Sequence, residues 1–311
     1  MNVNRRDFLK ASAAIAGALA LKGSGLMQLQ KAMADGSSKP PVIWLQGQGC
    51  TGCSVSLLNS IYYMTIDQLL INTIDVKFHP TVMAAAGDMA VNAANEPNSG
   101  YVLVIEGAIP DGAGGDYCHI WENMTMLDAV EIFAPDAGAI LAVGTCACYG
   151  GMSAGSPNPT GAKGVGAVLG QNVINIPGCP AHPDWIVGSV AALLAGETPE
   201  LDDQGRPKVF FDTEVHKKCP NRMLGVQAKT LSDAGCLSGL GCKGQQTHAD
   251  CPLRKWNAGG QGESGVNWCV GARNPCQGCT EPDFPDGMSP FYHPMERNIS
   301  PKTQDKRKFR F

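Results

Sequence analysis

The residues best able to do chemistry in this chain are its thirteen cysteines. Two of them stand in Cys50-Thr51-Gly52-Cys53, directly after a short apolar run. A C-x2-C turn directs two thiolates at one point, and zinc ribbons, redox dithiols and iron-sulfur sites all use this spacing. The pair alone does not distinguish between these three kinds of site, so the positions of the other cysteines must be considered.

The first part of the chain contains elements that would position these thiols. Short apolar runs rich in β-formers alternate with helix-favouring stretches, which predicts an α/β fold built on a flavodoxin-like, doubly wound parallel sheet. The strand-like runs are 42–45, 76–78, 101–105, 140–143 and 173–176, and the helix-like stretches are 81–94, 121–133 and 183–194. We expect this domain to occupy residues 35–201.

Four cysteines follow predicted strands. Cys50 and Cys53 come after the first strand, Cys146 after the fourth and Cys179 after the fifth. All three loops should lie at the carboxyl edge of the sheet, where ligands bind in such folds, so the four thiols should converge. Buried structural thiols or a four-thiolate zinc are the alternatives. The scattered spacing favours an iron-sulfur cluster, because zinc sites more often use two close pairs.

The remainder, residues 202–311, is predicted to be an irregular domain that needs more than a hydrophobic core to hold it. It contains one H-x2-C pair, a second C-x2-C pair and four further cysteines between them. These eight candidate ligands match two four-iron clusters: His216, Cys219, Cys236, Cys242, Cys251, Cys269, Cys276 and Cys279. Twelve ligands in all suggest three clusters, which is an electron relay. Taken alone, without the cysteines that follow it, His216 is better interpreted as a surface histidine beside two lysines.

The N-terminus reads as an export signal. Arg5-Arg6 precedes an apolar run over 11–21, and Ala32-Met33-Ala34 offers a cleavage site, so residues 1–34 are predicted to be a twin-arginine signal for the periplasm. That route exports folded proteins, often with a cofactor inserted, which favours metal over disulfides. The apolar run is too short for a membrane span, and we expect no transmembrane anchor in this chain.

Net charge restricts the partners. The formal charge of −4 becomes −8 once residues 1–34 are removed, because they hold five basic residues and one acidic residue. A negative chain argues against nucleic acid as a partner and permits a basic protein.

In this order, the motifs closely resemble the small subunit of nickel-iron hydrogenases. They are the twin-arginine leader, C-x2-C after the first strand, Gly-Thr-Cys, Pro-Gly-Cys-Pro-x-His-Pro-Asp-Trp, H-x2-C and Pro-Cys-x-Gly-Cys-x-Glu-Pro. The resemblance implies an iron-sulfur subunit without catalytic residues of its own. It would carry electrons between a large subunit, where hydrogen is split or made at a nickel-iron site, and an acceptor, typically a multihaem c-type cytochrome.

The resemblance also implies a ligand set for each cluster. The proximal 4Fe-4S cluster would be held by Cys50, Cys53, Cys146 and Cys179. The distal 4Fe-4S cluster would be held by His216, Cys219, Cys236 and Cys242. The medial cluster would be held by Cys251, Cys276 and Cys279, with Cys269 as a further thiolate.

Cys269 is a departure from many members of this family, which have proline at this point and a medial 3Fe-4S cluster. The sequence Asn267-Trp268-Cys269 offers a fourth thiolate and implies a medial 4Fe-4S cluster, so that the chain would hold three 4Fe-4S clusters. This feature resembles the nickel-iron-selenium subgroup, whose selenocysteine lies in the large subunit.

Two other interpretations compete with this one. One is a related subunit of another respiratory oxidoreductase that shares the proximal-cluster fold, although such relatives generally lack the leader and the later ligands. The other is an exported binding module held by disulfides or zinc.

The two remaining cysteines, Cys118 and Cys148, are expected to be buried as small apolar side chains.

Overall fold

A five-stranded parallel sheet forms the centre of the fold in the computed structural model, which describes residues 39–194, 199–260 and 262–294. The predicted signal, residues 1–34, lies outside these ranges. The strand order is β2-β1-β3-β7-β9, which is the flavodoxin-like order 2-1-3-4-5. The strands are β1 (Pro41–Gln46), β2 (Asp75–Phe78), β3 (Val102–Glu106), β7 (Ala139–Val143) and β9 (Ile174–Ile176). Each lies within one residue of its predicted run, so the predicted α/β fold is confirmed.

Helices cover both faces of the sheet, which explains why its strands are apolar throughout. Successive residues of β1 point to opposite faces: Trp44 packs in one core, and Ile43 and Leu45 pack in the other. The Trp44 face is covered by α3 (Gly52–Leu58) and α8 (Pro183–Leu194), and the opposite face by α4 (Asp88–Asn95), α5 (Met126–Phe133), α6 (Thr145–Tyr149) and α7 (Val165–Leu169).

Two of the predicted helices are shorter than expected. The 81–94 stretch becomes helical only at Asp88, and the 121–133 stretch only at Met126. Thr125 and Asp128 form a capping box that starts α5, and the preceding residues form a small hairpin of β5 (His119–Trp121) and β6 (Met124–Thr125). The third predicted helix is α8, whose bounds are as expected.

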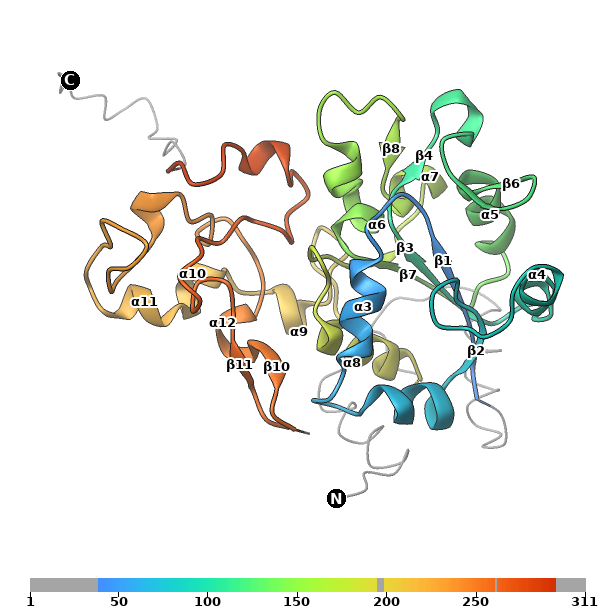
Figure 1. Cartoon of the computed structure of the whole chain (residues 1–311), viewed down its shortest axis with the longest axis horizontal. Helices are drawn as coiled ribbons and strands as arrows, with labels where there is room; N and C mark the ends of the chain where they lie inside the picture. The colour runs from blue at the N-terminus through green and yellow to red at the C-terminus, as the bar shows by residue number, and fades with distance from the viewer. Residues whose placement is uncertain (1–38, 195–198, 261, 295–311) are drawn as a thin grey trace.

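The C-terminal segment lies beside the sheet as a unit of short elements and loops (Figure 1). It contains α9 (Lys208–Phe211), α10 (Val215–Lys218), α11 (Pro220–Met223), α12 (Cys251–Arg254) and the antiparallel pair β10 (Trp256–Ala258) and β11 (Gly265–Asn267). Its buried side chains, including Val215, Leu237 and Trp268, belong to the same core as Trp44 and α8. No helix in the described part of the chain is long and apolar enough to cross a membrane.

Candidate metal centres

The four cysteines that follow strands of the sheet do come together. The amide of Ala181, in the loop after β9, donates to Cys53 Sγ at 3.4 Å. Burial first, and then the charges of Cys146 and Cys50, raise the pKa of the Cys179 thiol to about 11. Burial also raises the pKa of Cys53, and Cys146 and Cys179 raise it further. Cys50 and Cys179 are exposed, so this set lies at the surface of the chain.

Glycine allows this close approach of loops. A Cβ at Gly144 would lie 2.5 Å from Cys53 Sγ, and one at Gly151 would lie 3.0 Å from Cys146 Sγ. Both glycines also have a positive φ, of 85° and 50°, which a side chain would disfavour. The glycines therefore make room for the thiols where the loops meet.

Glu106, the last residue of β3, holds the first of these loops. Its buried carboxylate accepts hydrogen bonds from the amides of Cys53 (3.0 Å) and Ser54 (3.2 Å) at the start of α3. Trp44 Nε1 and Gln46 Nε2 each donate to its other oxygen at 3.0 Å, and the Ser54 hydroxyl donates there as well. Helix α3 has no side-chain cap of its own, so a carboxylate from a neighbouring strand satisfies its first amides.

Thr145 joins the sheet-edge thiols to the C-terminal segment. Its hydroxyl accepts from the amide of Gly178 at 2.9 Å and donates to the carbonyl of Cys279. The Thr145 amide in turn donates to the carbonyl of Gly178 at 3.0 Å. One buried side chain therefore fixes the loops of Cys146 and Cys179 against the backbone of Cys279.

Cys279 belongs to a second set of neighbouring thiols. Burial raises the pKa of Cys251, and the charges of Cys279, Cys276 and Cys269 raise it further. Cys251, Cys276 and Cys279 are buried or half-buried, whereas Cys269 is exposed. Burial likewise raises the pKa of Cys279 to about 12, and the amide of Cys179 opposes this shift. The second set therefore lies next to the first.

The third set surrounds Cys242. Burial raises the pKa of Cys242, the amides of Gly244 and Cys276 lower it, and the charges of Cys219 and Cys236 raise it. His216 joins this set through Gly244, whose carbonyl accepts the His216 amide at 2.8 Å. A Cβ at Gly244 would lie 3.5 Å from Cys242 Sγ and 3.6 Å from the His216 amide nitrogen. His216 is half-buried, and burial lowers its pKa, which favours the neutral form that binds metal.

The second and third sets are linked by backbone. The amide of Cys276 donates to Cys242 Sγ at 3.3 Å, and the amide of Lys243 donates to the carbonyl of Cys276 at 2.7 Å. The three groups of thiols thus form a continuous line through Thr145 at one junction and this pair of bonds at the other.

These donor sets fit iron-sulfur clusters. None of the cysteines is in a disulfide, and no three His, Cys, Asp or Glu side chains among the described residues are placed to hold a single metal ion. The first two sets each bring four thiols together, and the third brings three thiols together beside the backbone of His216. Amides point at sulfurs in all three sets, which stabilises thiolates. A cysteine binds metal as a thiolate, and the positive charge of the metal offsets the cost of burying that negative charge.

The two remaining cysteines are not among the predicted ligands, although Cys148 lies near the first set: burial raises its pKa, and the charges of Cys53 and Cys146 raise it further. The Cys148 thiol is buried and donates to the carbonyl of Ala142 at 3.2 Å. Cys118 is half-buried and packs against the core opposite Trp44. Cys148 therefore fits the expectation of a buried, small apolar side chain, whereas Cys118 is less buried than expected.

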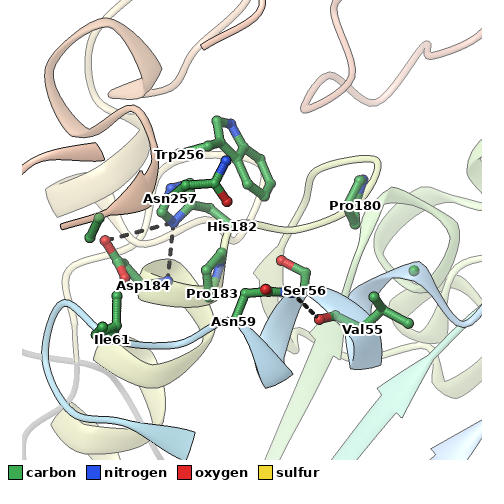
Figure 2. A pocket seen from close by; sticks show the side chains of 12 residues that line it. Val55, Ser56, Asn59, Ile61, Pro180, His182, Pro183, Asp184, Trp256 and Asn257 are labelled. Carbon is green, nitrogen blue, oxygen red and sulfur yellow. Dashed lines mark hydrogen bonds and ion pairs between the residues drawn. The ribbon is translucent and has the colours of Figure 1, made fainter. Parts of the chain in front are cut away.

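A hollow of about 360 Å³ opens beside the first set of thiols (Figure 2). Val55 and Ser56 of α3 form one wall, Pro180 and His182 a second, and Trp256 of β10 a third. His182 is buried and fixed, because its Nδ1 accepts the amide of Asp184 at 3.1 Å and its Nε2 lies 2.6 Å from the Lys255 carbonyl. The hollow is therefore a rigid, mainly apolar surface next to Cys50 and Cys179.

The fold and the three thiol sets define an iron-sulfur type of electron-transfer protein, and comparison with known proteins specifies the family. Residues 211–292 match the family described as the C-terminal part of the NiFe/NiFeSe hydrogenase small subunit, and residues 50–193 match NADH ubiquinone oxidoreductase, 20 Kd subunit. The periplasmic [NiFeSe] hydrogenase small subunit of Desulfomicrobium baculatum is 42% identical over 94% of this chain and 99% of its own length. The chain belongs to the small subunits of nickel-iron and nickel-iron-selenium hydrogenases.

Other relatives agree. The periplasmic [NiFe] hydrogenase small subunit 1 of Nitratidesulfovibrio vulgaris is 39% identical, with 93% of each chain covered. The solved structure of the [NiFeSe] hydrogenase from Desulfovibrio vulgaris Hildenborough matches with a TM-score of 0.76 and 48% identity, covering 83% of this chain and 98% of that one. The resemblance stated from the motifs is thus confirmed. The chain is the electron-transfer subunit of a two-subunit hydrogenase whose active site lies in the large subunit.

The export signal is also confirmed. Residues 2–22 match the twin-arginine translocation signal, and the small subunits of Desulfomicrobium baculatum and Nitratidesulfovibrio vulgaris named above are periplasmic, so this chain is a periplasmic protein.

Sequence reasoning missed Glu106 and Thr145. Glu106 ends an apolar run, and a carboxylate in that position signals a role at the sheet edge. Thr145 stands in the Gly-Thr-Cys motif, but nothing in the sequence shows that its hydroxyl reaches Cys279.

Proposed function

We propose that this protein relays electrons between the large subunit and a c-type cytochrome through three 4Fe-4S clusters. The observation that carries the proposal is the series of three connected thiol sets, the third with His216 beside it. When bound, each cluster supplies a one-electron carrier. The chain's own residues would hold these carriers in sequence and exclude water from them.

The proposed ligands are those assigned from the sequence. The proximal set is Cys50, Cys53, Cys146 and Cys179; the medial set is Cys251, Cys269, Cys276 and Cys279; the distal set is His216, Cys219, Cys236 and Cys242. Mutual effects on thiol pKa values support each grouping of cysteines. The contacts of Gly244 with the His216 backbone and Cys242 support the fourth distal donor. We propose domain limits that place the proximal set in 35–201 and the other two sets in 202–311.

The junctions support the order of the relay. Thr145 places the proximal loops against the medial ligand Cys279. The Cys276 amide then connects the medial set to the sulfur of the distal ligand Cys242. Electron transfer by short hops needs successive sites to lie close together, and these contacts bring neighbouring sets together.

We propose that the face holding Cys50, Cys179 and the hollow beside them is covered by the large subunit. Exposed cluster ligands need protection from water, and the hollow offers an apolar docking surface. The presence of Cys269 supports a selenium-containing partner, as in the Desulfomicrobium and Desulfovibrio relatives. The distal set would face the cytochrome, because a half-buried His216 with Lys217 and Lys218 exposed beside it lies at the opposite end of the line.

The test is anaerobic purification of the chain with its partner, followed by metal and sulfide analysis. Three 4Fe-4S clusters predict about twelve irons and about twelve inorganic sulfides per small subunit. Hydrogen-dependent reduction of a purified c-type cytochrome tests the acceptor. Preparations without inorganic sulfide would reject the relay, whereas about twelve irons with no cytochrome reduction would reject the acceptor alone.

A further inference from the structure

Lys243 is a buried lysine whose charge no carboxylate neutralises in the described part of the chain. Its side chain is only 1% exposed. The ammonium donates to two neutral carbonyls, those of Pro290 at 3.1 Å and His293 at 2.8 Å. No ion pair found among residues 39–194, 199–260 and 262–294 includes it. Burying an unpaired charge is costly, so a counter-charge is expected nearby.

The position of Lys243 indicates what that counter-charge is. It directly follows Cys242 of the distal set, and its amide donates to the carbonyl of Cys276 in the medial set at 2.7 Å. Its own carbonyl accepts from the Thr247 hydroxyl at 2.8 Å, and this hydroxyl lies 3.5 Å from Cys276 Sγ. The backbone of Lys243 is therefore fixed where two thiol sets meet, and each set would carry net negative charge with its cluster bound.

We propose that Lys243 is the fixed cation that raises the reduction potentials of the medial and distal clusters. A positive charge in a poorly solvated site stabilises the reduced state of a neighbouring cluster, which carries one more electron, and so raises its reduction potential. The residue acts through the clusters, so it is a positioning and tuning residue. This inference rests on the proposed function, since it needs the two clusters to be present.

The experiment is a potentiometric titration of the purified heterodimer, followed by electron paramagnetic resonance of the reduced clusters. Lys243→Met removes the charge at nearly constant length, Lys243→Arg keeps it, and Lys218→Met removes a solvent-exposed lysine beside the distal set as a matched control. Lys243→Met should change the oxidised-to-reduced ratio of the medial and distal clusters at least tenfold, which is about 59 mV downward for a one-electron couple. The proximal cluster should shift less, and the Arg and control variants little.

Each outcome has a defined meaning. Full iron content in Lys243→Met with unchanged potentials would overturn the inference and leave the relay intact. Loss of medial and distal signals in both Lys243 variants would overturn it too, because the residue would then serve only to anchor residues 290–293. Lowered medial and distal potentials in a Lys243→Met protein of full iron content, with native potentials in Lys243→Arg, would support it. A parent protein without clusters would instead reject the proposed function.

Discussion

Replacing Glu106 should loosen helix α3 and with it the loop that carries Cys50 and Cys53. In Glu106→Gln, the amide oxygen can still accept the Cys53 and Ser54 amides. Its NH₂ group then faces Trp44 Nε1, which donates to the carboxylate at 3.0 Å in the parent. One buried donor without an acceptor costs about 2 kcal/mol, which is about a 30-fold change in an equilibrium constant.

Glu106→Ala removes the acceptor of five donors at once. The Gln46 side-chain amide also donates to the Ser54 hydroxyl, and that hydroxyl lies 3.3 Å from His79 Nε2. Three donors are therefore left without another partner: the amides of Cys53 and Ser54 and the indole of Trp44. At about 1–3 kcal/mol for each, and with water replacing some of the lost bonds, we expect a cost of about 3–6 kcal/mol. The proximal cluster should be lost in this variant, so that iron falls by about four per heterodimer.

Hydrogen–deuterium exchange of the purified heterodimer measures the effect, because local opening of α3 exposes its amides. Peptides covering Gly52–Leu58 should exchange at least about 100-fold faster in Glu106→Ala, which loses the bonds to the Cys53 and Ser54 amides, than in the parent. Glu131→Gln, an exposed carboxyl on α5, is the control and should leave exchange unchanged. Exchange in Glu106→Ala within about threefold of the parent would refute the idea that this carboxylate holds the helix.

Burial, crowding and ligand count lead to three further predictions. Burial lowers the pKa of His79 from 6.5 to about 4, so between these pH values the unfolded chain binds a proton that the folded chain does not. The folded state should therefore lose about 2 kcal/mol of stability between pH 7 and pH 5. Urea unfolding measures this loss, and an equal loss in the parent and in His79→Gln would contradict the prediction. Gly144→Ala should lose about four irons, because the added Cβ would crowd the Cys53 sulfur. Gly170→Ala is the control: its φ is also positive, at +62°, but no atom lies within 4 Å of the added Cβ, so it should keep its iron. Equal iron loss in both variants would point to backbone strain instead of crowding. Cys269→Ala should lose about one iron and gain the oxidised 3Fe-4S resonance, and the absence of that resonance would argue against Cys269 as a ligand.

The strands of the sheet could be predicted well because buried parallel strands are continuous apolar runs bounded by turn residues. The bounds of α8 were also predictable, since its twelve residues are apolar nearly throughout and begin at a proline. Helix α6 was not predicted. It has only five residues, and its formation depends on Gly144 and on tertiary contacts, not on periodicity.

The candidate sites also include a part that the sequence predicts and a part that it does not. Cysteines that follow strands could be assigned to one edge of the sheet, because topology fixes where the carboxyl ends of parallel strands meet. The grouping of the later cysteines came from the family resemblance alone. Nothing in the sequence shows that the Cys276 amide reaches Cys242 or that the Lys243 side chain is buried, because both depend on how irregular loops pack.

The hydroxyl of Thr145 has a consequence for how the protein matures. A hydroxyl has one proton to donate, and here that proton goes to a carbonyl 134 residues further along the chain. A polypeptide cut before Cys279 would leave this donor facing the interior without its acceptor. The N-terminal half should therefore reach its final arrangement only after the C-terminal half has been synthesised and packed, which suits a protein that crosses the membrane already folded.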